Sequence, residues 1–300
     1  MNKITFILIA ICIFSSFYAC KEDEFTDSVF QDAPAIDPTS PAYNFEMWLE
    51  SNFRKPYNLS FQYRMEDVGS DQDYNLVPAS LEKSKQLAQL IKYLWFDVYA
   101  SMVDEEFLKK YGPRMIHLIG SAAYNPNSGT MLLGTAEGGI KVTLYSCNDL
   151  DLTSFSQQNL DMMNEFYFKT MHHEFTHILH QTKDYPRSFE KISAGKYSPM
   201  GWQYRTDEEA AKLGFISTYA GSEAREDFVE IIANYLVKSD KDWNAVLEMA
   251  GSEGSSIIAQ KLAICSDWLL EKWNIDIDRM REEILRRQQS LDASFYNNDL

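Results

Sequence analysis

The stretch His172-His173-Glu174-Phe175-Thr176-His177-Ile178-Leu179-His180 contains the pattern H-E-x-x-H, in which His173 and His177 are the two histidines. On an α-helix, residues four apart lie about one turn apart, so both imidazoles project from one face. Two nitrogen ligands in that arrangement can bind one Zn²⁺ ion at about 2.0–2.1 Å. Glu174 lies beside them, where it can take a proton from water. The motif therefore predicts a hydrolytic zinc site on a helix.

The residues around the motif predict a long helix over Gln157–His180. Neither Pro nor Gly interrupts the part that precedes the motif, and its apolar residues keep a broadly helical spacing. Asp184 and Pro186 follow where such a helix should end. The motif is therefore expected in the last two turns.

The third ligand of the site must come from elsewhere, because a catalytic zinc ion usually has three protein ligands. The metzincin pattern H-E-x-x-H-x-x-G-x-x-H fails, since His180 and Lys183 occupy its Gly and last His positions. A later segment, Ser222–Leu236, has an apolar face of helical period. Its Glu226 and Glu230 share another side, which favours one as metal ligand and the other as acceptor for a ligand histidine. A solvated acidic face is the alternative.

These two motifs, H-E-F-T-H and, about 50 residues later, E-D-F-V-E, resemble the gluzincin group of zinc metallopeptidases. The chain most resembles the zinc-binding metallopeptidase lipoproteins of Gram-negative bacteria, with site motifs similar to those of lethal-factor-like enzymes. The resemblance implies that Glu226 is the third zinc ligand and that Glu230 orients a ligand histidine. It also implies an oxyanion contact for Tyr219, seven residues before Glu226. An ordinary packed tyrosine is the alternative for Tyr219.

These assignments predict a zinc-dependent peptidase that uses one Zn²⁺ ion to hydrolyse peptide bonds of extracellular proteins or peptides. Glu174 is expected to act as the general base and to pass its proton to the leaving amine. Two alternatives remain open. One is a catalytically inactive surface binding lipoprotein of a polymer (glycan or peptide) uptake system, and the other is a zinc hydrolase that cleaves other bonds.

The N-terminus predicts a lipoprotein signal. Lys3 precedes a short apolar run, Ile4–Phe14, which is too short for a membrane span. Ala19-Cys20 resembles a lipobox, and Lys21–Glu24 resembles the export signal of surface lipoproteins. We expect an outer membrane lipoprotein, exposed at the cell surface and attached to the membrane through lipidated Cys20. Ordinary cleavage and secretion is the alternative.

The pattern along the chain, with this resemblance, predicts an α+β, zincin-like metallopeptidase fold: a small mixed sheet with the active-site helix, plus a helical C-terminal lobe. We expect a signal peptide (1–19), a flexible tether (20–42) and one domain (43–295), with lobes of about 43–181 and 182–295. Strands are predicted at 60–65, 115–119, 130–133 and 140–145, with a turn at 134–139. Further helices are predicted at 81–102, 105–111, 207–213, 223–238, 240–250, 255–273 and 277–292.

The strand at 140–145 is expected at the edge of the sheet, where an extended peptide could pair with it. A plain edge strand is the alternative. His117 is expected in a buried or edge strand, and His172 and His180 at the surface or supporting the ligands. Cys147 and Cys265 could form a disulfide in an oxidising compartment. The formal net charge of −16 argues against nucleic acid as a partner. The oligomeric state is not indicated.

Overall fold

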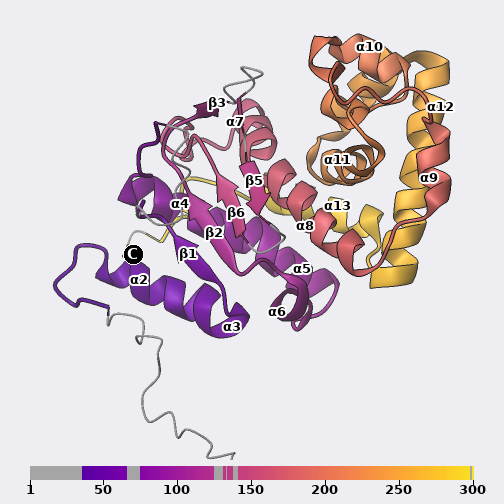
Figure 1. Ribbon diagram of the computed structural model, residues 1–300. Helices are drawn as coiled ribbons and strands as arrows, with labels where there is room; N and C mark the ends of the chain where they lie inside the picture. The colour runs from indigo at the N-terminus through magenta and orange to yellow at the C-terminus, as the bar shows by residue number, and fades with distance from the viewer. Residues whose placement is uncertain (1–35, 66–74, 125–130, 133, 138–140, 298) are drawn as a thin grey trace, which may run out of the picture. The chain divides into compact units, whose positions relative to one another are not determined.

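The computed structural model describes residues 36–65, 75–124, 131–132, 134–137, 141–297 and 299–300 (Figure 1). Within it, Thr39–Leu300 forms one compact unit. The predicted signal peptide, Cys20 and most of the predicted tether lie outside the described residues. Among the helices that are described, none combines the length and the apolar character needed to cross a membrane.

The sheet has four strands in the order β1-β2-β6-β5. Their bounds are β1 (Ser60–Gln62), β2 (Met115–Leu118), β5 (Gly134–Glu137) and β6 (Lys141–Leu144). The strands β1, β2 and β6 are parallel, and β5 is antiparallel to β6. Ile116 pairs in register with Phe61 on one side and Val142 on the other. Ile116 and Val142 are buried, as expected for parallel strands that are covered on both faces. A separate ladder pairs β3 (Ala123–Tyr124) with β4 (Met131–Leu132).

The prediction that the strand at 140–145 forms the sheet edge is wrong. Its described part, β6, lies between β2 and β5 and is hydrogen-bonded on both sides. The edge position belongs to β5, which falls inside the segment that we expected to be a turn. The Gly residues of that segment indicated a turn, and only the pairing with β6 makes Gly134–Glu137 a strand.

The helices of the N-terminal half are partly π-helical. Those at 81–102 and 105–111 were predicted, whereas the helical segment at 43–57 was not. Their bounds are α2 (Tyr43–Leu49), η1 (Glu50–Arg54), α3 (Lys55–Tyr57), α4 (Leu81–Ile91), η2 (Lys92–Phe96), α5 (Asp97–Met102) and α6 (Phe107–Tyr111). The π turn η2 joins α4 to α5, so the predicted helix over 81–102 is one continuous helix. Ser80 caps it, since its side chain accepts a hydrogen bond from the Lys83 amide.

From α7 onward the described chain contains helices and loops. The bounds are α7 (Gln157–Met163), η3 (Asn164–Phe168), α8 (Lys169–Thr182), α9 (Arg187–Ile192), η4 (Trp202–Tyr204), α10 (Asp207–Lys212), η5 (Tyr219–Gly221), α11 (Ala224–Val237), α12 (Asp240–Trp273) and α13 (Ile277–Gln289). Gly251 has a φ of 66° inside α12, which breaks the helix between the two predicted ones. The structure thus confirms a mixed α and β fold that is mostly helical.

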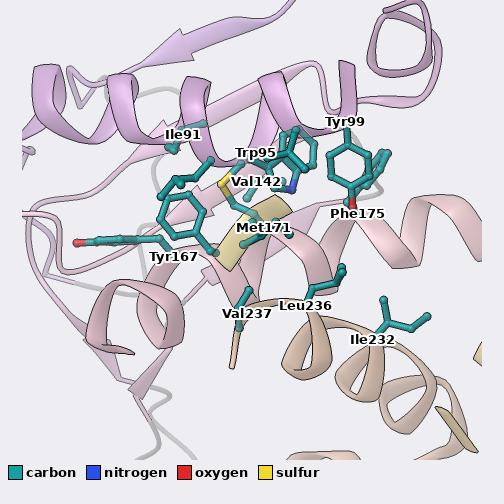
Figure 2. Close-up of a cluster of buried hydrophobic side chains, with 14 of the residues drawn as sticks. Ile91, Trp95, Tyr99, Val142, Tyr167, Met171, Phe175, Ile232, Leu236 and Val237 are labelled. Atoms are coloured by element: carbon teal, nitrogen blue, oxygen red, sulfur yellow. The ribbon is translucent and has the colours of Figure 1, made fainter. Parts of the chain in front are cut away.

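The core around α8 fixes the direction in which this helix faces (Figure 2). On one face of α8, the ring of Phe175 packs edge-on against Trp95 and Tyr99 of the α4–α5 helix, with centroid distances of 5.1 and 5.0 Å. Figure 2 shows Ile232 and Leu236 of α11 approaching from another direction. Because its apolar face is held by these contacts, α8 turns its H-E-x-x-H face toward α11.

The two cysteines of the folded unit do not form the disulfide that the sequence left open. Cys147 and Cys265 are free thiols, and both are fully buried. Burial raises the pKa of each thiol, that of Cys147 to about 12, so both thiols are protonated at neutral pH. His117 lies in β2 and is buried, as predicted.

Candidate metal centre

The helix that carries the H-E-x-x-H motif runs without interruption from α7 through the π turn η3 to the end of α8. The Ser156 side chain caps its start by accepting a hydrogen bond from the Asn159 amide. At its end, Lys183 leaves the helical conformation with φ −137° and ψ 107°. The predicted helix over 157–180 is therefore confirmed, with two further residues at its C-terminus. Single π turns of this kind are frequent at functional sites.

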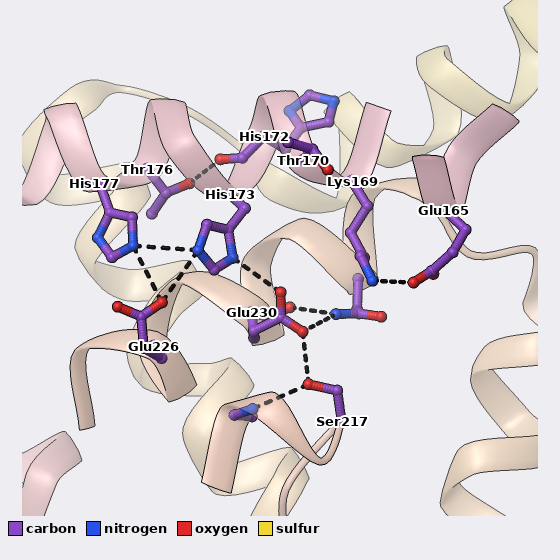
Figure 3. Close-up of polar contacts among 12 residues, drawn as sticks. Glu165, Lys169, Thr170, His172, His173, Thr176, His177, Ser217, Glu226 and Glu230 are labelled. Atoms are coloured by element: carbon purple, nitrogen blue, oxygen red, sulfur yellow. Dashed lines mark hydrogen bonds and ion pairs between the residues drawn. The ribbon is translucent and has the colours of Figure 1, made fainter. Parts of the chain in front are cut away.

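Three potential ligand atoms converge between α8 and the first turn of α11 (Figure 3). The Nε2 atoms of His173 and His177 lie 3.2 Å apart, and they lie 3.1 and 3.3 Å from one Glu226 carboxylate oxygen. Ligand atoms at about 2.0–2.1 Å from a tetrahedral zinc ion lie roughly 3.3–3.4 Å apart. The observed spacing therefore fits one such ion. We call these three residues the triad.

Glu230 contacts the far side of His173. One carboxylate oxygen lies 2.9 Å from His173 Nδ1, and the other accepts hydrogen bonds from Ser217 Oγ at 2.6 Å and from Asn234 Nδ2 at 3.2 Å. When the His173 ring is neutral and donates Nδ1–H to Glu230, the lone pair of its Nε2 points into the triad. Burial alone would raise the pKa of Glu230, but the charge of Lys169 and the contact with His173 lower it to about 2.

The sequence left two expectations for His172 and His180: a place at the surface, or a place that supports the ligands. The structure excludes the surface for both. Both side chains are buried. His172 points away from the triad in Figure 3, and its Nδ1 lies 3.1 Å from the Tyr99 hydroxyl. His180 Nε2 lies 2.9 Å from His177 Nδ1, in line with the supporting position that was the other expectation. Burial, followed by the nearby charges of His177 and Arg225, lowers the pKa of His180 to about 4.

His173 and Glu226, two of the triad residues, hold opposite charges. Burial acts against the charged form of His173, but its hydrogen bonds to Glu226 and Glu230 raise its pKa to about 10. Burial likewise acts to raise the pKa of Glu226, and the two histidines outweigh it and hold that pKa well below its ordinary value. The carboxylate is therefore ready as an anionic ligand at neutral pH.

Glu174 and Tyr219 lie near the triad but do not belong to it. Burial raises the pKa of Glu174, as do the charges of Glu226 and Glu230, while the two triad histidines oppose the rise. The ring of Tyr219 lies 6.0 Å from that of His173. Burial and then the Glu226 charge raise the pKa of the Tyr219 hydroxyl, so it is protonated at neutral pH and can donate a hydrogen bond.

Several side chains around the triad were not identified from the sequence. Ser217 and Asn234 hold Glu230, and the Trp202 ring packs edge-on against Tyr219 at 5.1 Å. Asn234 lies four residues after Glu230 on α11, so helical spacing gave a usable signal for it. No comparable signal pointed to Ser217 or Trp202, because both reach the site from loops and short 3₁₀ turns.

A buried ion pair holds another side of α11. Lys261 Nζ of α12 lies 2.6 Å from an Asp227 carboxylate oxygen and donates to the Gly214 carbonyl at 2.7 Å. The Tyr197 hydroxyl donates to the same Asp227 oxygen at 2.8 Å. Both charged side chains are at most 1% exposed. Since Asp227 follows Glu226 directly, this pair helps to fix the first turn of α11.

Comparison with known proteins assigns the chain to a family. Residues 39–278 match the family described as "Putative zinc-binding metallo-peptidase". The chain is also similar to a crystal structure of a putative zinc-binding metallo-peptidase from Bacteroides caccae. The two are 45% identical, the match covers 89% of this chain and 98% of that one, and the TM-score is 0.73. No curated protein matches. The family match spans well over half of the sequence, and the chain therefore belongs to this zinc-binding metallo-peptidase family.

Proposed function

We propose that this protein is a zinc-dependent peptidase that cleaves extracellular proteins or peptides. The observation that carries the proposal is the convergence of two imidazole nitrogens and one carboxylate oxygen within 3.3 Å of one another. Two neutral nitrogen ligands and one anionic oxygen ligand form a donor set typical of catalytic zinc, and the set leaves a fourth position for water.

In this proposal, His173, His177 and Glu226 hold a single Zn²⁺ ion. When bound, zinc lowers the pKa of water toward about 7 and polarises a carbonyl group. The His173 Nδ1 contact with Glu230 fixes the orientation of that ring for binding. We also propose a zincin-like fold of the gluzincin type, which is supported by the meeting of the H-E-x-x-H helix α8 with a candidate ligand glutamate from the later helix α11.

Glu174 is the proposed general base. It accepts a proton from the attacking water and transfers it to the leaving amine, and the raised pKa of its carboxylate favours this role. Tyr219 is the proposed donor to the oxyanion that develops on the scissile carbonyl, because its protonated hydroxyl belongs to the side chain that packs beside His173.

The test is a comparison of zinc content and peptide cleavage in wild type and Glu174→Gln. We expect wild type to bind one zinc per chain and to cleave members of a peptide library, with cleavage lost on chelation and restored by zinc. Glu174→Gln should retain zinc and lose about 10²–10⁴-fold in kcat. Glu208→Gln, a variant of an exposed carboxylate on α10, is the matched control and should behave as wild type.

Two outcomes would contradict the proposal. If Glu174→Gln cleaves at the wild-type rate, Glu174 is not the base. If wild type binds zinc but cleaves no peptide, the alternative of a catalytically inactive surface binding lipoprotein gains support over the peptidase.

We also propose, from the sequence, that Cys20 is lipidated and anchors the enzyme at the outer face of the outer membrane. The lipobox-like Ala19-Cys20 and the charged residues after it support this placement. Fatty-acid labelling of cells should mark wild type but not Cys20→Ala. Protease treatment of intact cells should degrade the wild-type protein, and protection from the protease would place it elsewhere.

A further inference from the structure

The last histidine of the motif segment, His180, has no part in the proposed reaction. We propose that His180 is the positioning residue for the ligand His177, as Glu230 is for His173. The inference rests on the proposed zinc site and assigns a residue that the H-E-x-x-H pattern does not contain. His180 occupies the position at which the metzincin pattern has Gly, so its side chain is an addition to the motif.

The geometry fixes which atom of each ring carries hydrogen. His177 Nε2 faces the triad, 3.3 Å from the Glu226 oxygen, so this atom must offer its lone pair to a metal ion. In a neutral ring, the hydrogen is then on His177 Nδ1. His180 Nε2 lies 2.9 Å from that atom and can only be the acceptor. His180 must therefore carry its own hydrogen on Nδ1.

Packing holds the His180 ring in this orientation. His180 is 7% exposed, and its ring lies nearly perpendicular to that of Tyr185, with the ring centroids 5.5 Å apart. Tyr185 in turn stacks on Phe228 at 4.4 Å with an interplanar angle of 17°. Phe228 belongs to α11, the same helix that provides Glu226. The ring that supports His177 is therefore fixed to both helices that carry the ligands, α8 and α11.

A neutral acceptor suits this position better than a carboxylate. The carboxylates of Glu226 and Glu230 already contact the ligand histidines, at 3.1 and 3.3 Å for Glu226 and at 2.9 Å for Glu230. A further carboxylate close to His177 would add another negative charge to the same small volume. An imidazole acceptor fixes the ring of His177 without that charge, so the two ligand histidines are supported by groups of different chemistry.

The first experiment uses paired substitutions. His180→Leu keeps a similar volume but removes the acceptor, and His180→Gln places an amide oxygen near the position of Nε2. Zinc affinity is measured by competition with a chromophoric chelator. We expect His180→Leu to bind zinc about 10–100-fold more weakly than wild type and His180→Gln to recover to within about threefold. His172→Gln, a buried histidine on the same helix that contacts no ligand, is the matched control and should keep wild-type affinity.

The second experiment needs no variant. Long-range ¹H–¹⁵N spectra of the histidine rings in the zinc-loaded wild type should show His177 with hydrogen on Nδ1 and His180 with an unprotonated Nε2. A Co²⁺-substituted protein adds a test of ligand geometry, because the visible absorption of bound Co²⁺ should change in His180→Leu and be restored in His180→Gln.

The outcomes separate this inference from the proposed function. Equal zinc affinity in wild type and His180→Leu would overturn the inference alone, as would hydrogen on His180 Nε2. Equal losses in His180→Leu and His180→Gln, each matched by a loss of folding stability, would show a purely structural role and also overturn it. A wild type that binds no zinc would overturn the proposed function and this inference together.

Discussion

Glu226 and Asp227 are consecutive residues on α11, yet their carboxylates have opposite surroundings. Asp227 is fully buried and contacts the Lys261 ammonium at 2.6 Å. Glu226 is 14% exposed, and its ion-pair partners among the described residues are His173 and His177. One turn of helix thus carries an ion pair that the chain completes by itself and a carboxylate that faces two nitrogen ligands.

The difference indicates how a structural charge can be distinguished from a ligand. A buried carboxylate requires a cation or several donors, because removal from water costs several kcal/mol. Lys261 supplies that cation permanently for Asp227. At Glu226, the positive charge comes from His173, which must be neutral to bind a metal ion. The site is therefore arranged to exchange protons for a divalent cation.

The largest expected effect comes from breaking the ion pair between Asp227 and Lys261. Lys261→Met should lower the free energy of unfolding by about 3–5 kcal/mol, because it leaves the Asp227 carboxylate buried without a cation. Urea unfolding measures the change. The double variant Lys261→Met/Asp227→Leu should recover at least half of the loss. A loss below about 1 kcal/mol in Lys261→Met would show that this pair does not hold α11.

The next largest effect on stability concerns the triad, and it should depend on zinc. Zinc at 100 times its dissociation constant should stabilise wild type by about 2.7 kcal/mol. Glu226→Gln removes the anionic ligand, so the same zinc concentration should add less than about 1 kcal/mol. Thermal unfolding with and without zinc measures both values. Equal stabilisation of the two proteins would exclude Glu226 as a ligand.

A smaller effect, on zinc affinity, is expected when the ligand His173 is kept and the charge of Glu230, which orients it, is removed. Glu230→Gln retains a hydrogen-bond acceptor for His173 but removes the charge. Zinc affinity should fall by about 10–100-fold, which is less than the loss of a ligand. Chelator competition measures it, with Glu208→Gln as the control for loss of an exposed carboxylate. Unchanged affinity would mean that the charge of Glu230 serves only folding.

The smallest effect is expected from Glu283 on α13, an ion pair nearer the surface. Hydrogen bonds from Arg286, followed by those from Arg287, lower the pKa of Glu283 to about 2 from an ordinary value of 4.5. The depressed pKa means that its stabilisation is present above pH 4.5 and is lost as pH falls from 4.5 to 2. The contribution should stay below about 1 kcal/mol. Urea unfolding of Glu283→Gln across this range should show a weaker pH dependence, and an unchanged dependence would contradict the assignment.

The sequence by itself determined the local geometry of the site. Four-residue spacing placed His173 and His177 on one face of a helix, and it placed Glu226 and Glu230 on one face of another. The positions of the main helices followed from apolar periodicity, because that pattern records which side of each helix is buried. These features depend on contacts within a few turns of chain, so they can be read without the fold.

The tertiary structure alone decided how the two helices face each other. It placed Glu226 toward both Nε2 atoms, Glu230 behind His173 and His180 behind His177. It also paired Asp227 with Lys261, which lies 34 residues further along the chain, and made β5 the sheet edge. Such contacts join segments distant in sequence, so they depend on how whole elements pack and leave no periodic signal in the residues themselves.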